Sequence, residues 1–75
     1  MAHQLIDAFR ANVEALLTKR KMSRSELAER LGCTPSYVTQ VLGGHRGVGL
    51  EAVENFAKAL GVKPETLLRV AAGAA

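Results

Sequence analysis

Residues 22–44 carry the start and stop signals of two short helices, and they constrain the fold more than any other part of the chain. Ser23 and Glu26 have the spacing of a capping box, in which the hydroxyl accepts from the Glu26 N–H and the carboxylate reaches back. The apolar face of the following helix begins at Leu27. Gly32 ends this helix, because the position just beyond a helix favours positive φ.

A second short helix follows almost at once. Thr34 can cap it, and Pro35 suits its first position, where no N–H is needed. Its inward face is apolar, and its outward face is short, polar and uncharged. The inward residues are Val38, Val41 and Leu42, and the outward ones are Ser36, Tyr37, Thr39, Gln40 and Gly43. Outward side chains of this kind suit hydrogen bonding to base edges in the major groove of DNA.

Helical spacing of apolar residues predicts three more helices. The first runs from about Gln4 to Arg20; its apolar residues are Leu5, Ile6, Phe9, Val13, Leu16 and Leu17, and Asp7, Arg10, Asn12 and Glu14 fill the other side. The second ends at Gly61, and its inward residues are Leu50, Val53, Phe56, Ala57 and Leu60. A last short helix is expected from Pro64 to near Val70.

Length and composition limit the classes of protein that fit. The 75 residues suffice for one domain, whose ordered part we expect to span about residues 4–70, with a frayed tail over 71–75. A hydrophobic content of 48% supports a folded core, and the net charge of +3 is compatible with a polyanionic partner. One cysteine excludes an internal disulfide, and no apolar run approaches the ~18 residues of a membrane span. We therefore expect a soluble cytoplasmic protein without a metal or other cofactor.

The motifs together resemble those of a known family. Residues 23–32 read Ser-x-x-Glu-Leu-Ala-x-x-Leu-Gly, and residues 37–44 read Tyr-Val-x-x-Val-Leu-x-Gly. With residues 50–62, which match the fourth helix of the family, they resemble the helix-turn-helix domain of phage repressor and Cro-like (XRE) proteins. The resemblance covers roughly residues 9–68. It implies an all-α, five-helix, lambda-repressor-like domain whose helix-turn-helix is the pair of short helices.

The same resemblance implies sequence-specific binding of double-stranded DNA by a homodimer on a palindromic operator, in the role of a transcriptional repressor or other regulator. The second short helix would enter the major groove. Base contacts would come from Ser36, Thr39 and Gln40, flanked by Pro35 and Tyr37. Gln40 can pair bidentately with an adenine edge, because its amide both donates and accepts. Tyr37 could instead pack over the turn.

Cations beside the two short helices predict contacts with the DNA backbone. Positive charge gathers near the N-terminus that Ser23 caps, and a helix N-terminus with nearby cations can hold one phosphate. These cations are Lys19, Arg20, Lys21 and Arg24. By resemblance Arg46, in the glycine-rich loop 43–49, would contact the backbone, and His45 could touch phosphate too. The expected phosphate contacts are thus Lys21, Ser23, Arg24, His45 and Arg46. The alternative interpretation is a solvated helix end and an exposed loop.

The last helix is expected to hold the dimer interface. Leu67, Leu68 and Val70 give it more apolar surface than so small a core obviously uses, although they could instead complete the core of one protomer. Two-fold pairing would place two recognition helices in successive major grooves, about 34 Å apart.

Other functions stay open for the same fold. Within DNA binding, the chain could be an antitoxin that represses its own operon and neutralises a toxin partner, or a restriction–modification controller. A protein-interaction module without DNA binding should lack basic residues around the first short helix, and this chain has them. Catalysis is not expected, because nothing in the sequence supplies a base or an oxyanion site for Cys33. His3 and His45 lack partners at metal-ligand spacing.

Overall fold

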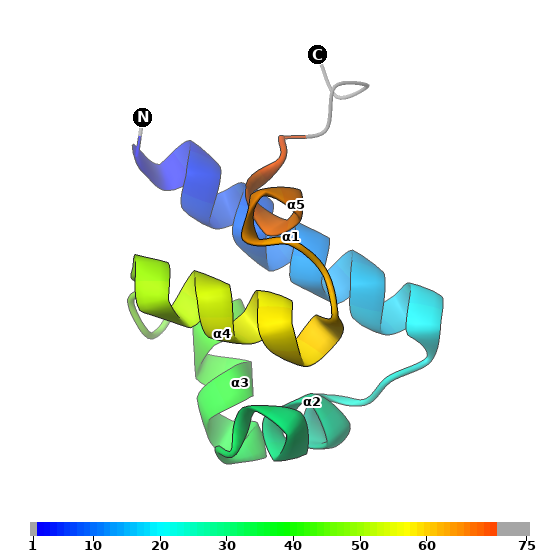
Figure 1. Cartoon of the computed structure of the whole chain (residues 1–75). Coiled ribbons are helices and arrows are strands. Elements are labelled where there is room, and N and C mark those ends of the chain that lie inside the picture. The colour runs from blue at the N-terminus through cyan, green and yellow to red at the C-terminus, as the bar shows by residue number, and fades with distance from the viewer. Residues whose placement is uncertain (1, 71–75) are drawn as a thin grey trace.

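The structure, a computed structural model, describes residues 2–70, with side chains from residue 5 onward, and this part of the chain contains five α-helices and no strand (Figure 1). The helices are α1 (Ala2–Arg20), α2 (Arg24–Leu31), α3 (Pro35–Leu42), α4 (Leu50–Leu60) and α5 (Pro64–Leu68). The predicted all-α fold of five helices is confirmed. The tail predicted at residues 71–75 lies outside the described residues. α5 ends before Val70, earlier than predicted, because Arg69 is already extended, with φ −71° and ψ 122°.

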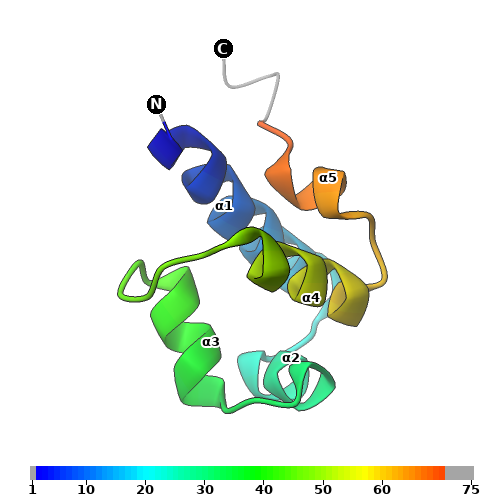
Figure 2. The ribbon, with the colours of Figure 1, turned by 60° about the vertical axis from the view of Figure 1, so that its left-hand side comes forward.

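The helices pack around one apolar core. α4 lies in the middle, with α1 and α5 on one side and α2 and α3 on the other, as Figure 2 also shows. Every helix contributes to the core. Its buried residues are Phe9, Val13, Leu17, Leu27, Ala28, Val38, Val41, Leu42, Val53, Phe56, Ala57, Leu60 and Leu67. At its centre the rings of Phe9 and Phe56 meet edge to face, with centroids 5.2 Å apart, a geometry that adds to the stabilisation from burial.

Two leucines that helical spacing placed on inward faces are exposed. Leu50 is 78% exposed, because it is the first residue of α4 and lies beyond the part of this helix that its neighbours cover. Leu5, near the start of α1, is 51% exposed. The spacing of apolar residues identifies the apolar face of a helix. It does not show which part of that face the neighbouring helices bury.

The helix boundaries of the α2–α3 pair follow the predicted signals. Ser23 Oγ accepts from the Glu26 N–H at 3.0 Å, and Thr34 Oγ1 accepts from the Tyr37 N–H at 3.2 Å. The Glu26 carboxylate lies 3.5 Å from Arg30 one turn further on. No hydrogen bond from the Ser23 N–H to this carboxylate occurs in the described part of the chain, so only one half of the predicted capping box is present.

Polar side chains of α1 hold other helices in place. Arg10 Nε donates to the carbonyl of Val41 at 2.9 Å, and Arg20 donates to the carbonyl of Leu60. Each of these carbonyls belongs to the last turn of its helix, where the helix itself supplies no N–H partner. Arg10 was predicted simply to fill the outer face of its helix. It instead satisfies a helix end that lies 31 residues away in sequence.

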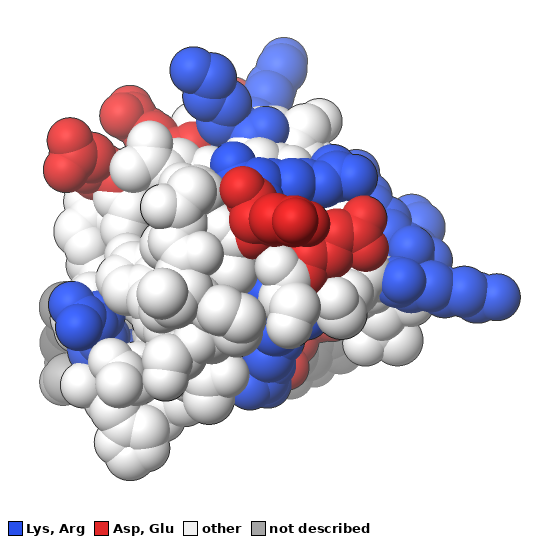
Figure 3. Space-filling model, turned by 90° about the horizontal axis from the view of Figure 1, so that it is seen from below, with Lys and Arg blue, Asp and Glu red and all other residues white. Residues whose placement is uncertain are grey.

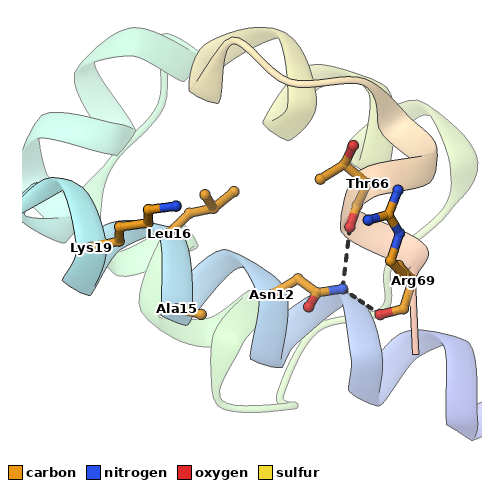
Figure 4. Close-up of a pocket in the computed structure, with 6 residues that line it drawn as sticks. All are labelled: Asn12, Ala15, Leu16, Lys19, Thr66 and Arg69. Carbon is orange, nitrogen blue, oxygen red and sulfur yellow. Dashed lines mark hydrogen bonds between the residues drawn. The ribbon is translucent and has the colours of Figure 1, made fainter. Parts of the chain in front are cut away.

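Asn12 fixes α5 against α1. Its side-chain nitrogen Nδ2 lies 2.7 Å from the Leu67 carbonyl oxygen, 2.8 Å from that of Arg69 and 3.4 Å from that of Thr66. Figure 4 shows this amide at one side of a shallow hollow between the two helices. One side chain therefore satisfies several carbonyls at the end of a helix that is only five residues long.

We predict that Asn12→Asp destabilises the protein by about 2 kcal/mol, because it replaces the donating amide with a carboxylate that faces carbonyl oxygens. Urea unfolding followed by circular dichroism measures the change in the free energy of unfolding. Asn55→Asp is the matched control, since Asn55 is exposed on α4. Equal losses in the two variants would show that Asn12 does not secure α5.

Candidate nucleic-acid interface

The outward face of α3 is open to solvent, as predicted. Ser36, Thr39 and Gln40 are exposed, and so is Pro35 at the first position of the helix. The opposite face of α3 is buried in the core, so packing fixes which side chains point outward. Figure 2 shows α3 at the lower edge of the fold with α2 beside it. α3 therefore exposes a short, uncharged surface that can form hydrogen bonds, and its buried face holds the helix in place.

A backbone turn fixes the end of α3 and the start of the loop that follows. Gly44 has φ +84°, and the turn around it lets the His45 N–H donate to the Gln40 carbonyl at 2.9 Å, which closes a Schellman motif. A Cβ on Gly44 would stand 3.7 Å from Cζ of Arg10, the residue that binds the last turn of α3. The loop consequently turns back toward the exposed face of the helix.

Arg46, brought back by this turn, contacts two residues of α3. Its Nε donates to Oε1 of Gln40 at 3.2 Å, and its Cζ lies 5.2 Å from the centroid of the Tyr37 ring. Tyr37 is half-buried, and its ring centroid lies 6.4 Å from that of Phe56 in the core. In the free protein Tyr37 thus lies between the edge of the core and Arg46. A base contact by Tyr37 stays a prediction.

Charge on this side of the molecule is divided between its edges. Figure 3 looks at α2 and α3 from below: Lys and Arg side chains line one edge and appear again at the opposite edge, with a broad uncharged surface between them. Acidic side chains interrupt the larger basic edge. Arg24 Nη2 lies 3.0 Å from Oε1 of Glu14, so this predicted phosphate contact is paired in the free protein.

The other predicted phosphate contacts separate into two groups. Lys21 and Ser23 are exposed beside Arg24 at the N-terminus of α2, and Lys21 has φ +53°. His45 and Arg46 are exposed in the loop at the far end of α3. The two groups therefore flank the uncharged face of α3 on opposite sides, which is how backbone contacts flank base contacts in a groove.

Other chemistry finds little support in this region. Cys33 is half-buried between α2 and α3, and burial raises the pKa of its thiol above the usual value, so the thiol stays protonated at neutral pH. Within the described residues, no three His, Cys, Asp or Glu side chains lie together as metal ligands. No helix in residues 2–70 is long and apolar enough to cross a membrane.

The predicted dimer residues fall into different environments. Leu67 is fully buried in the protomer core, so its assignment to an interface was wrong, and it completes the core instead. Leu68 is half-buried and Val70 is 43% exposed, so both leave apolar surface available.

An apolar hollow of about 290 Å³ lies where the first turns of α1 and α4 meet α5. It is lined mainly by Leu5, Ile6, Val48, Leu50 and Leu68. We call this surface the α1–α4–α5 groove.

Comparisons with known proteins agree with this geometry. The chain is 38% identical over 52 residues to control protein C.BamHI of Bacillus amyloliquefaciens, a match that covers 69% of this chain and 64% of that protein, slightly less than two thirds of its length. It is 36% identical over 58 residues to the uncharacterized HTH-type transcriptional regulator YozG of Bacillus subtilis, covering 76% of this chain and 69% of that one.

Two crystal structures share the fold. The hypothetical transcription factor NHTF from Neisseria superposes with a TM-score of 0.81 at 29% identity, over 88% of this chain and 76% of that one. The restriction-modification controller protein C.AhdI from Aeromonas hydrophila gives a TM-score of 0.74 at 31% identity, over 89% of this chain and 98% of that one.

Two short helices joined by a tight turn, with the second exposing polar side chains, define a helix-turn-helix protein. The chain belongs to the helix-turn-helix domain family, which matches residues 8–71, and it is thereby a member of a family of DNA-binding transcription regulators. The predicted resemblance to phage repressor and Cro-like proteins is confirmed.

We predict that Gly44→Ala destabilises the protein by about 1–2 kcal/mol, because φ +84° is costly for a residue with a Cβ. Gly47→Ala is the matched control: its backbone φ is not positive, and an added Cβ would meet nothing within 4 Å. Thermal unfolding of both variants tests the difference. A control variant as unstable as Gly44→Ala would contradict the importance of this turn.

Proposed function

We propose that residues 4–70 form a single domain that binds double-stranded DNA in a sequence-specific manner as a homodimer and acts in the cytoplasm as a transcriptional repressor. The observation that carries the proposal is the exposed face of α3. Ser36, Thr39 and Gln40 point outward together, and none of them is needed for the core. Hydroxyl and amide groups at this spacing can hydrogen-bond to successive base edges when the helix lies in the major groove.

The distribution of charge supports the same orientation. Lys21 and Arg24 lie beside the N-terminus of α2, and Arg46 lies beyond the other end of α3. A helix laid in the groove with these cations on either side can reach a phosphate strand with each group. The ion pair of Arg24 with Glu14 is partly exposed, so DNA can exchange it for a phosphate contact at small cost.

The α1–α4–α5 groove supports pairing with a second copy of the chain. Leu50, exposed at 78%, is the most prominent apolar side chain of the groove. Val48 lies in the loop that follows α3, and Leu50 comes directly after this loop, so pairing at this groove would hold two α3 helices on one side of the dimer. Two such helices fit half-sites that lie one turn of DNA, about 34 Å, apart.

A restriction–modification controller is the more specific candidate for this function. Both control protein C.BamHI and controller protein C.AhdI are similar to this chain, and the match to the second covers 89% of this chain. Genes for a restriction endonuclease and a DNA methyltransferase beside the gene for this chain would support a controller. A reporter fused to the promoter of those genes would show whether the protein lowers transcription, as a repressor should.

We predict that Gln40→Ala weakens binding to the selected operator by about 1–3 kcal/mol and relaxes the preference at one base pair in each half-site. Binding to random DNA should change little, since no charge is removed. Operator selection from a randomised library, followed by titrations on selected and random duplexes, measures both effects. Asn55→Ala on α4 is the control. Equal losses on all sequences would mean that Gln40 reads no base, and a wild-type protein that selects no sequence would overturn the proposed function.

We predict that Leu50→Glu raises the dissociation constant of the dimer by about 100-fold or more, because two-fold symmetry places the charge twice in an apolar contact. Helix stability should not suffer, since an acidic residue suits the first turn of α4. Asn55→Glu introduces the same charge on an exposed part of α4 outside the groove. Sedimentation equilibrium of wild type and both variants measures the effect. A dimer that survives Leu50→Glu would place the interface elsewhere.

A further inference from the structure

Arg46 engages the side chain that is best placed to read a base. Its Nε donates to Oε1 of Gln40 at 3.2 Å, while its guanidinium group lies over the ring of Tyr37, with Cζ 5.2 Å from the centroid. Because arginine only donates hydrogen bonds, the atom of the Gln40 amide that faces it must be the oxygen. The orientation of the Gln40 amide is thereby determined, and its NH₂ group is directed away from Arg46.

The fold holds Arg46 in this position from two sides. The N–H of His45 donates to the Gln40 carbonyl, so the residue next to Arg46 is tied to the backbone of Gln40 itself. The Tyr37 ring packs near Phe56 in the core, which gives the guanidinium group a fixed surface on which to lie. A planar guanidinium fits this surface and still has two terminal nitrogens available for further donation.

We propose that Arg46 is a positioning residue for Gln40, and that the pair acts as a donor-only unit that selects guanine rather than adenine at its base pair. This inference rests on the proposed DNA binding through α3. It assigns Arg46 a part in base selection, in addition to the phosphate contact that the sequence predicts.

The chemistry of the base edges gives the direction of the preference. In the major groove guanine presents two acceptors, N7 and O6, whereas adenine presents the acceptor N7 and the N6–H₂ donor. A free glutamine suits adenine because it offers a donor and an acceptor. With its oxygen engaged by Arg46, Gln40 offers mainly its NH₂ group, and the terminal nitrogens of Arg46 add further donors. An all-donor surface matches guanine and opposes the donor of adenine.

The test compares the base preference of wild-type protein, Arg46→Ala and Arg46→Lys in selections from a randomised double-stranded library. The base pair read by Gln40 is the one whose preference disappears in Gln40→Ala. We expect wild type to favour guanine there by about tenfold over adenine, and both Arg46 variants to shift toward adenine. Arg46→Lys keeps the positive charge, so a shift of base preference in this variant would not come from the loss of a charge.

Two further variants test the role of the aromatic surface. Tyr37→Leu keeps an apolar contact with the core but removes the ring, and it should shift the base preference as Arg46→Lys does. Tyr37→Phe keeps the ring that the guanidinium group contacts, so it should shift the preference less than Tyr37→Leu does. Lys21→Ala, which removes an exposed cation that does not contact Gln40, should weaken binding to all sequences alike.

The outcomes separate this inference from the proposed function. Sequence selection by wild type with the same base preference in Arg46→Lys would overturn the role of Arg46 in base selection and leave DNA binding by α3 intact. An adenine preference in wild type would also overturn the role of Arg46 in base selection and leave DNA binding by α3 intact. A wild-type protein that selects no sequence would overturn the proposed function and this inference together.

Discussion

The burial of the apolar face of α3 in the common core is the interaction on which the rest of the structure depends. Val38 and Val41 are fully buried, and the rings of Phe9 and Phe56 lie in the same core. A recognition helix of eight residues is too short to be stable alone. Its orientation therefore comes from burial, and the side chains that point to solvent are those that the core does not use.

Local signals explain why the sequence predicted much of this arrangement. The cap at Thr34, the proline at position 35 and the glycine at position 32 act within a few residues of the helix ends that they define. Each of these effects depends on backbone geometry next to the residue, so no knowledge of the fold is required. The fold class and the outward face of α3 followed from the same kind of evidence.

The features that the sequence did not predict depend on contacts between distant segments. Arg10 and Asn12 looked like ordinary polar residues of an exposed face, since their carbonyl partners are 31 to 57 residues away in the chain. Leu67 and Leu50 have the same apolar character, yet one is buried and the other is open to solvent. Periodicity cannot distinguish them, because burial depends on which helix passes over each position. The contact of Arg46 with Gln40 likewise requires the path of the loop.

α1 connects the two surfaces that the proposed function uses. Arg10 ties it to the end of α3, and Asn12, two residues further on, ties it to α5 beside the groove. A hinge between the recognition helix and the pairing surface would have to break one of these attachments. In the homodimer proposed here, the distance and the angle between the two α3 helices would therefore be fixed. An operator whose half-sites are wrongly spaced or phased would have to bend or twist to fit, and the elastic energy of the DNA between the half-sites would enter recognition although no side chain touches those bases.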